Sequence, residues 1–149
     1  MKVVIQRSLE AKVEVSGKIV GSIDHGLVLL VGVDKRDEKE DAVFLSNKIQ
    51  NLRIFSDENG LMNRSILQSG GSFLTISQFT LIAEYKKGNR PSFIQAAAPE
   101  KAKELFNYFV ELLKESGAKV ETGEFGADMQ VSLVNDGPVT IVMDSHTKS

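Results

Sequence analysis

Residues 27–31 read Leu-Val-Leu-Leu-Val, an apolar run with no polar residue in it. A strand with one exposed face alternates apolar and polar residues, so this unbroken run predicts a strand that is covered on both faces. Stretches upstream, around Val3 and Ile5 and around Val13 and Val15, have the alternation of strands with one exposed face. The run therefore predicts a strand that lies between two layers of the fold.

Two segments further along the chain have apolar residues at helical spacing. Asp37 is a suitable N-cap for the first, and Glu40 completes a capping-box pattern. The apolar face of this first helix consists of Ala42, Leu45, Ile49 and Leu52. Pro99 suits the first turn of the second helix, and Gly117 ends it. The apolar stripe of this second helix consists of Ala102, Leu105, Phe106, Phe109, Leu112 and Leu113.

Short strands are expected at residues 53–55, 72–76 and 119–121. Two more, around 131–133 and 139–143, would be joined by a hairpin. Strands outnumber helices, and two amphipathic helices can cover only one face of a sheet. We therefore expect an α/β fold of mixed, mostly antiparallel sheets, which form two β layers in a barrel-like arrangement with a layer of two main helices on one side. The length of 149 residues favours a single domain, residues 1–149.

The composition excludes several classes of function. The net charge of −2 argues against a general binder of the phosphate backbone, such as a DNA-binding protein, although contact with the tip of a tRNA stays open. There is no cysteine, hence no thiolate zinc site and no cysteine nucleophile. The N-terminus carries charge too early for a signal peptide, and no apolar run could span a bilayer. We expect a cytoplasmic protein without a membrane partner.

The segment Ser77–Leu81, which reads Ser-Gln-Phe-Thr-Leu, ends the strand expected at 72–76. In one interpretation its apolar residues pack, while Gln78 and Thr80 are solvated on the other side of the strand. In the other, the strand ends at a cleft, where Gln78 forms hydrogen bonds and Thr80 acts as a weak nucleophile or a positioning group. Thr80 has no evident base, because the chain has only two histidines, one in a turn and one in the tail.

The segment Asn135–Thr140 reads Asn-Asp-Gly-Pro-Val-Thr. Asp136 and Gly137 are typical of a hairpin turn, and Pro138 can open a strand. A hairpin explains less well why proline directly follows glycine. A Gly-Pro pair can adopt a cis bond, which would fix the direction of two carbonyl groups and suit them to reading stereochemistry.

The segment Lys86–Arg90 places three cations within five residues. Such runs are usually solvated surface. Against an acidic background, however, a local basic loop can also contact phosphates.

Together these segments resemble the D-aminoacyl-tRNA deacylases, formerly called D-tyrosyl-tRNA deacylases. The resemblance rests on 77–81 and on the run from Phe125 to Thr140, which looks like the C-terminal signature of that family. Residues 87–93 and the opening Gln6-Arg7 also match in place. It covers essentially the whole chain in order.

The resemblance implies a homodimer with two active sites at the interface. In each, a cis Gly137-Pro138 from one subunit would enter the pocket of the other, and its carbonyls would hold the α-amino group of the substrate. An L-amino acid would drive its side chain into this clamp, whereas a D-amino acid or glycine would not. The catalytic residues it implies are Thr80, Gln78 and Phe79, and the substrate-binding residues are Ser77, Gly137, Pro138, Met129 and Arg7.

By the same resemblance, Arg7 braces the Gly-Pro loop and Met129 packs near the terminal adenine. Backbone N–H groups around Phe79 and Thr80 would stabilise the oxyanion, and the adenosine 2′-OH would assist hydrolysis. The reaction expected is hydrolysis of D-aminoacyl-tRNA such as D-tyrosyl-tRNA, as chiral proofreading in translation quality control, with glycine mischarged on tRNA(Ala) as a second substrate. No metal or organic cofactor is implied. The alternative is a non-catalytic dimeric domain that binds an aminoacyl or nucleotide end.

Overall fold

A computed structural model describes residues 1–147 of the chain. Its elements, in chain order, are β1 (Lys2–Val15), β2 (Lys18–Ile23), β3 (Gly26–Gly32), α1 (Lys39–Asn51), β4 (Phe55–Ser56), β5 (Met62–Arg64), α2 (Ile66–Ser69), β6 (Ser72–Ser77), the 3-10 helix η1 (Phe79–Leu81), α3 (Pro99–Glu115), β7 (Val120–Thr122) and β8 (Gln130–Asp144). None of the helices in residues 1–147 is both long and apolar enough to cross a membrane.

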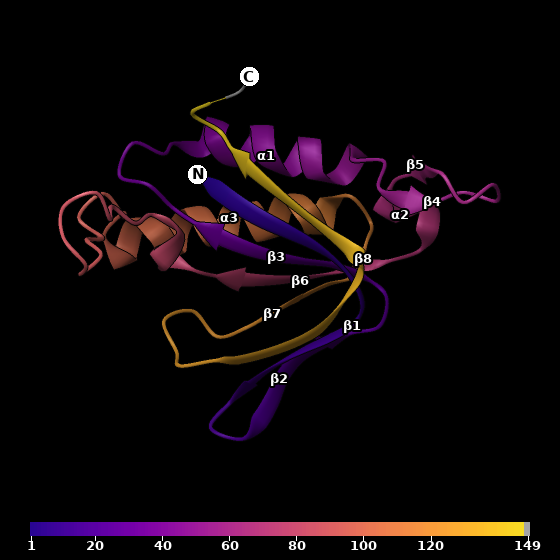
Figure 1. Ribbon diagram of the computed structural model, residues 1–149, viewed down its shortest axis with the longest axis horizontal. Coiled ribbons are helices and arrows are strands. Elements are labelled where there is room, and N and C mark those ends of the chain that lie inside the picture. The colour runs from indigo at the N-terminus through magenta and orange to yellow at the C-terminus, as the bar shows by residue number, and fades with distance from the viewer. Residues whose placement is uncertain (148–149) are drawn as a thin grey trace.

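The main sheet has the order β2-β1-β3-β6-β7, and β8 pairs with β1. β3, β6 and β7 are parallel to one another, while β1 is antiparallel to β2, β3 and β8. Helices α1 and α3 lie together on one face of the sheet, and the part of the curled sheet that contains β2 lies away from them (Figure 1). The mixed, mostly antiparallel fold with its two main helices on one side is therefore confirmed.

The sheet curls because β1 belongs to both β layers. Its first half pairs with β3 through residues 2–8, and its second half pairs with β2 through residues 11–15. The edges of the curled sheet then approach each other, so that the N–H of Ser22 in β2 donates to the Glu121 side chain in β7 at 3.4 Å. The two stretches of alternating polarity that the sequence shows in this region are thus one continuous strand of 14 residues.

Two hydrophobic cores follow from the curl. The larger one lies between the sheet and the helices, and its centre is Val3, Ile5, Leu27, Leu29, Leu45, Ile49, Phe73, Phe109 and Leu113. The smaller one lies between the β layers and contains Ala11, Val13, Ile23, Val28, Leu74 and Ile76. Strand β3 contributes to both, with Leu27 and Leu29 facing the helices and Val28 facing the inner layer. The prediction of a strand covered on both faces is confirmed.

The prediction of a hairpin with its tip at residues 135–140 is wrong. Residues 130–144 form a single strand, and both halves of it pair with β1: Val131 lies opposite Val13, and Thr140 lies opposite Gln6. The ladder is interrupted between these two pairs, where the register shifts around Ser8. The Gly-Pro segment is therefore an irregularity within a strand, because its two flanking halves continue along the same partner instead of folding onto each other.

Two boundaries also differ from those expected. Strand β6 stops at Ser77, and the residues after Gln78 turn into the 3-10 helix, so they do not alternate as strand residues would. Helix α1 has Glu38 as its N-cap, with a capping box between Glu38 and Asp41. Asp37 cannot serve as the cap because its side chain is buried and accepts the N–H of Asp34 at 2.7 Å.

Candidate active site

The end of β6 is fixed against the end of β3. The N–H of Gln78 donates to the carbonyl oxygen of Val31 at 2.7 Å. Gly32 allows this approach, because a Cβ there would lie 3.0 Å from the carbonyl oxygen of Gln78 and from Cβ of Leu81. The chain then turns through η1, which carries Phe79 out to the surface, where 57% of the residue is exposed. The strand-end motif thus opens a cleft, as one of its two interpretations required.

A pocket of about 680 Å³ lies at this edge of the sheet. Ser77, Gln78 and Phe79 line one side, and Met129 lines another together with residues 125–128. The start of α3 and the segment before it, residues 96–99, complete the wall. Four of the predicted site residues therefore share one pocket. A second depression of about 440 Å³, between β1, β2 and β8, is lined by none of them.

Met129 has room in the pocket wall because residue 123 is glycine. A Cβ at position 123 would lie 2.5 Å from the sulfur of Met129. The rim carries an aromatic pair, in which the rings of Phe79 and Phe93 meet edge to face with centroids 5.3 Å apart. Apolar side chains and backbone groups make up most of this wall, which suits a flat apolar group such as a base.

Thr80 lies beside the pocket and not in its lining. The side-chain amide of Gln78 donates to the hydroxyl oxygen of Thr80, which orients that hydroxyl. Among the described residues that line the pocket, Asp128 is the only carboxylate and there is no histidine. Within residues 1–147, the hydroxyl of Thr80 forms no hydrogen bond with a carboxylate or a histidine, so no general base is in place to activate it.

The backbone of η1 offers hydrogen-bond donors instead. The first N–H groups of a helix lack an intrahelical acceptor. Within residues 1–147, neither the N–H of Phe79 nor that of Thr80 donates to a protein group, while the following N–H of Leu81 bonds to the carbonyl of Gln78. Two adjacent free N–H groups at the mouth of a pocket can bind the oxygen of a carbonyl that acquires negative charge.

The Gly-Pro segment is held at a different place. The Gly137-Pro138 bond is cis, as the resemblance implied. Arg7 supports the segment from β1: its Nε donates to the carbonyl oxygen of Asp136 at 3.1 Å, and its Nη1 donates to the carbonyl oxygen of Ile54 at 2.7 Å. Both Gly137 and Pro138 are exposed.

Side-chain hydrogen bonds close the base of the loop. Asn135 accepts the N–H of Val139 at 3.1 Å and donates to the hydroxyl of Thr140 at 2.9 Å. Gly137 has φ of +127°, and a Cβ there would lie 2.8 Å from Cγ2 of Val139 and 3.1 Å from Nη2 of Arg7. The loop therefore has a defined shape, and only glycine fits at its turn.

Within one chain the loop and the pocket do not meet. Arg7, which holds the loop, pairs with Leu27 at the start of β3, whereas Val31 near its end lines the pocket. These positions are four residues apart on β3, or about 13 Å along the strand. Arg7, Gly137 and Pro138 are therefore not brought together with Ser77, Gln78, Phe79 and Met129 in this structure.

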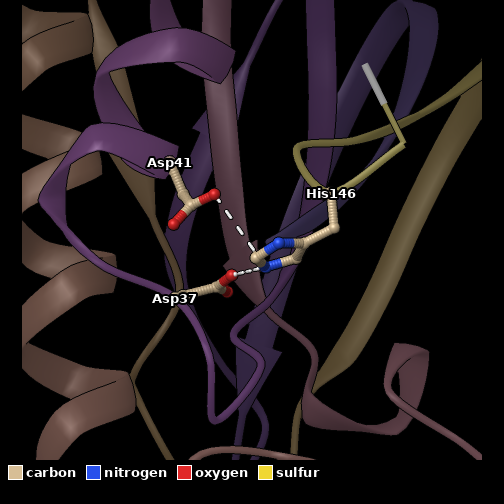
Figure 2. Close-up of side chains that lie close together, drawn as sticks. All are labelled: Asp37, Asp41 and His146. Carbon is tan, nitrogen blue, oxygen red and sulfur yellow. Dashed lines mark hydrogen bonds and ion pairs between the residues drawn. The ribbon is translucent and has the colours of Figure 1, made fainter. Parts of the chain in front are cut away.

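A polar cluster that sequence reasoning missed, with two buried carboxylates and an exposed histidine, lies at the N-terminal end of α1 (Figure 2). The carboxylate of Asp37 accepts from the amino group of Met1 and lies 2.6 Å from Nε2 of His146, while Asp41 lies 3.9 Å from the same nitrogen. Burial works to raise the pKa of Asp41, but hydrogen bonds from Glu38 and Ser145 outweigh it, so the pKa is lowered. Because the Met1 amine already supplies a cation, we interpret the cluster as a link between Met1, the start of α1 and His146 rather than as a metal site.

The connection from β3 to α1 carries a second buried carboxylate. Asp34 accepts hydrogen bonds from the backbone N–H and the guanidinium of Arg36, and more distantly from the amide of Gln95 at 3.4 Å. Burial works to raise the pKa of Asp34, but the Arg36 guanidinium and these hydrogen bonds hold it well below its usual range. The carboxylate ties the pocket-wall segment around Gln95 to the end of β3.

The sequence is similar to those of known proteins over nearly its whole length. Residues 4–144 match the family model described as D-Tyr-tRNA(Tyr) deacylase. A D-aminoacyl-tRNA deacylase from Geobacillus sp. (strain WCH70) is 54% identical over 149 residues, which is 100% of this chain and 98% of that protein. One from Thermosipho africanus (strain TCF52B) is 58% identical over 145 residues, which is 97% of each chain.

Solved structures share the fold. A protein described as c-Myc DNA Unwinding Element Binding Protein superposes with a TM-score of 0.90 at 38% identity, covering 97% of this chain and 98% of that one. A probable eukaryotic D-amino acid tRNA deacylase superposes with a TM-score of 0.81 at 17% identity, covering 95% and 97% of the two chains. The second likeness, at that identity, concerns the fold alone.

Proposed function

Because this chain belongs to the D-Tyr-tRNA(Tyr) deacylase family, we propose that it hydrolyses the ester that joins a D-amino acid to the 3′ end of tRNA and spares the L-form. Water adds to the ester carbonyl, and the tetrahedral intermediate releases the free D-amino acid and tRNA. The enzyme is a carboxylic ester hydrolase. Its role would be to remove wrongly charged tRNA in translation quality control.

The observation that carries the mechanism is the pair of free N–H groups on Phe79 and Thr80, beside a pocket whose described lining holds one carboxylate, Asp128, and no histidine. They can bind the oxyanion that forms when water adds to the carbonyl, and one such donor is worth about 10²- to 10³-fold in rate. The Thr80 hydroxyl accepts a hydrogen bond from Gln78, and within residues 1–147 it donates to no protein group that could take its proton. We therefore expect the 2′-OH of the terminal adenosine, which lies next to the ester, to assist the proton transfer.

Selection of the D-form is assigned to the Gly137-Pro138 loop of a partner subunit. The loop is exposed and supported from behind by Arg7, so it can protrude into a second molecule. Its carbonyl oxygens would hold the α-amino group and leave no space for an L side chain. Glycine has no side chain to exclude, so glycyl-tRNA(Ala) is expected to be a second substrate.

The loop and the pocket do not meet within one chain, but in a two-fold dimer the loop of one subunit and the pocket of the other could form one site. In such an assembly the same surface patch is used twice, so each loop can reach the pocket of the other subunit. Strands β1, β2 and β8 carry large exposed apolar residues that a dimer interface could bury: Leu9, Ile19, Val20, Val134 and Val142.

The decisive test of activity compares D-tyrosyl-tRNA, L-tyrosyl-tRNA and glycyl-tRNA(Ala) in one turnover assay. We expect hydrolysis of the first and third and near-inertness toward the second. Equal rates on both tyrosyl enantiomers would contradict the stereochemical proposal. Binding without turnover would instead indicate a non-catalytic domain.

A mixed dimer tests whether the loop acts across the interface. Gln78→Ala damages the pocket and Gly137→Ala damages the loop, so each homodimer should be nearly inactive. After co-refolding in equal amounts, mixed dimers contain one site with an intact pocket and an intact loop, and about a quarter of wild-type activity should return. If pocket and loop acted within one chain, mixing would restore nothing.

A further inference from the structure

A small basic loop stands next to the pocket. The backbones of Glu84 and Ser92 exchange two hydrogen bonds of 2.8 Å, which close the loop between them. Its tip carries the three cations of the segment Lys86–Arg90. In Figure 1 this part of the chain, coloured pink to orange, lies at the left edge, beyond the N-terminal end of α3 and away from the β4–β5 hairpin.

Tyr85 is the most exposed large apolar residue of this loop, with 76% of its surface open. Within residues 1–147, its ring contacts no other aromatic ring or cation, and its hydroxyl has no hydrogen bond. A tyrosine in a core or at a cap would have at least one such partner. Its exposed ring is therefore available to a ligand with an apolar face.

The cations beside Tyr85 are free to meet a ligand as well. None of Lys86, Lys87 and Arg90 forms an ion pair within the part of the chain described. Glu84, the nearest acidic residue in sequence, accepts the backbone N–H of Lys86 at 3.4 Å. Because the whole chain has a net charge of −2, this concentration of positive charge is local, and it favours a polyanion at this edge.

The loop is firmly connected to the pocket. Phe93 follows Ser92 directly, and its ring packs against Phe79. Beyond it, the N–H of Lys35 donates to the carbonyl of Gln95 at 2.9 Å, and the N–H of Ala97 donates to the carbonyl of Val33 at 2.9 Å. Because Glu84 pairs with Ser92, Tyr85 lies opposite residue 91, which is two residues before Phe93. Two residues of a strand span roughly 7 Å.

We propose that Tyr85 is a stacking platform for an unpaired base of the RNA strand that leads to the terminal nucleotide, while Lys86, Lys87 and Arg90 contact the phosphates of that strand. Aromatic rings interleaved with cations are what single-stranded RNA requires, since every base has a π-face. This inference rests on the proposed function, which places the terminal nucleotide in the pocket. It adds a sequence-tolerant subsite outside the pocket for the 3′ strand of tRNA.

The test compares two substrates that differ only in the upstream strand: D-tyrosyl-tRNA and D-tyrosyl-adenosine. We expect Tyr85→Ala to raise KM for D-tyrosyl-tRNA by about 5- to 150-fold, the cost of removing one base stack, with kcat unchanged. Hydrolysis of D-tyrosyl-adenosine should not change, because that substrate has no upstream base. Tyr85→Phe should behave as wild type, since stacking needs the ring and not the hydroxyl.

Leu61→Ala is the matched control, because Leu61 is 64% exposed but lies in the distant β4–β5 hairpin. It should affect neither substrate. The salt dependence of binding adds a second readout. Replacing Lys86, Lys87 and Arg90 by alanine should reduce the slope of log affinity against log salt concentration by about 0.7 for each phosphate that the loop no longer neutralises. Tyr85→Ala should leave this slope unchanged, because stacking releases no counterions.

Three outcomes overturn the proposal: an unchanged KM for D-tyrosyl-tRNA in Tyr85→Ala, an equal loss on both substrates, or an equal loss in Leu61→Ala. If the wild type hydrolyses neither substrate, the proposed function fails separately. In that case, a binding titration with a non-aminoacylated RNA that ends in CCA tests the Tyr85 subsite independently of catalysis. Weaker binding by Tyr85→Ala supports the platform, and equal binding by wild type and variant removes it.

Discussion

The pocket and the Gly137-Pro138 loop are built in opposite ways. The pocket consists mainly of apolar side chains and backbone groups at the ends of β3 and β6. The loop is shaped by polar side chains, with Arg7 and Asn135 supplying most of its hydrogen bonds. The first is a space for a ligand with donors at its mouth, and the second is a fixed projection with acceptors at its tip.

This contrast explains how an esterase can work with few titratable groups. The pocket can supply electrostatic stabilisation from N–H dipoles, which do not change protonation with pH. The loop can supply selectivity from shape. Because the two lie at opposite ends of β3, the proposed chemistry depends on the assembly of two chains, and variants should fall into two groups that complement each other.

The largest effect is expected from Gly137→Ala in the loop. The added Cβ would meet Val139 and Arg7, and its φ of +127° is strained for any residue but glycine. Displacement of the carbonyls by about 1 Å should cost roughly 10²-fold in kcat/KM for D-tyrosyl-tRNA. Gly60→Ala is the matched control, because Gly60 also has positive φ, +77°, but open space around it. Equal losses in both variants would mean that the loop has no special place in the reaction.

Arg7→Ala should have the next largest effect. It leaves the carbonyls of Asp136 and Ile54 without their donor, which costs about 1–3 kcal/mol in the free energy of unfolding. We expect kcat/KM for D-tyrosyl-tRNA to fall more than stability alone explains, because the loop loses its support. Arg7→Lys should not rescue activity, since an ammonium cannot reproduce the two-pronged geometry. Full activity in Arg7→Lys would show that the brace needs only charge.

Asp34→Asn tests, through the pH dependence of stability, whether the Asp34 carboxylate stabilises the pocket end of the fold. The pKa of Asp34 is lowered in the folded state, so its stabilising contribution is complete above the unfolded pKa of about 3.9 and is lost as pH falls below it. Thermal melts should show the variant less stable than wild type at pH 7, with a smaller further loss toward pH 3. Asp57→Asn, in the β4–β5 turn, is the comparison, because hydrogen bonds within that turn also lower the pKa of Asp57, but the residue has no contact with the pocket. The same pH profile in wild type and Asp34→Asn would contradict the role of this carboxylate.

The smallest effect is expected from Thr80→Ala. If the hydroxyl only accepts a hydrogen bond from Gln78, its loss should cost up to about 1.5 kcal/mol, or roughly tenfold in kcat. A nucleophile would cost several orders of magnitude, as in the serine hydrolases. Single-turnover kinetics and mass spectrometry decide the matter, because a trapped aminoacyl ester on Thr80 would overturn the backbone mechanism.

The layered fold was predictable because its pattern is local. The unbroken run at 27–31 and the helical stripe after Pro99 each determine which faces are buried, and both are found as expected. The prediction of a hairpin at residues 135–140 was wrong because a Gly-Pro pair fits an irregular turn within one strand as well as the tip of a hairpin. Which of the two forms depends on what the flanking halves pair with, and here both pair with β1. That information is not local to the segment.

The candidate site was predicted in parts. Ser77, Gln78, Phe79 and Met129 share one pocket, which the resemblance implied. The free N–H groups depend on where η1 begins, and a strand pattern extending to Leu81 hid that boundary. The cluster of Asp37, Asp41 and His146 could not be found, because it joins residues more than 100 positions apart in a chain where each looks like an ordinary surface group.

Gly123 has a consequence for how such chains can diverge. Its missing side chain is the space that the sulfur of Met129 occupies, so the two positions are not free to change independently. An alanine at position 123 would require the flexible side chain of Met129 to move from its present place in the pocket wall. The two positions are therefore coupled through the shape of the pocket, and a library that varies them together should recover pocket shapes that neither single replacement gives.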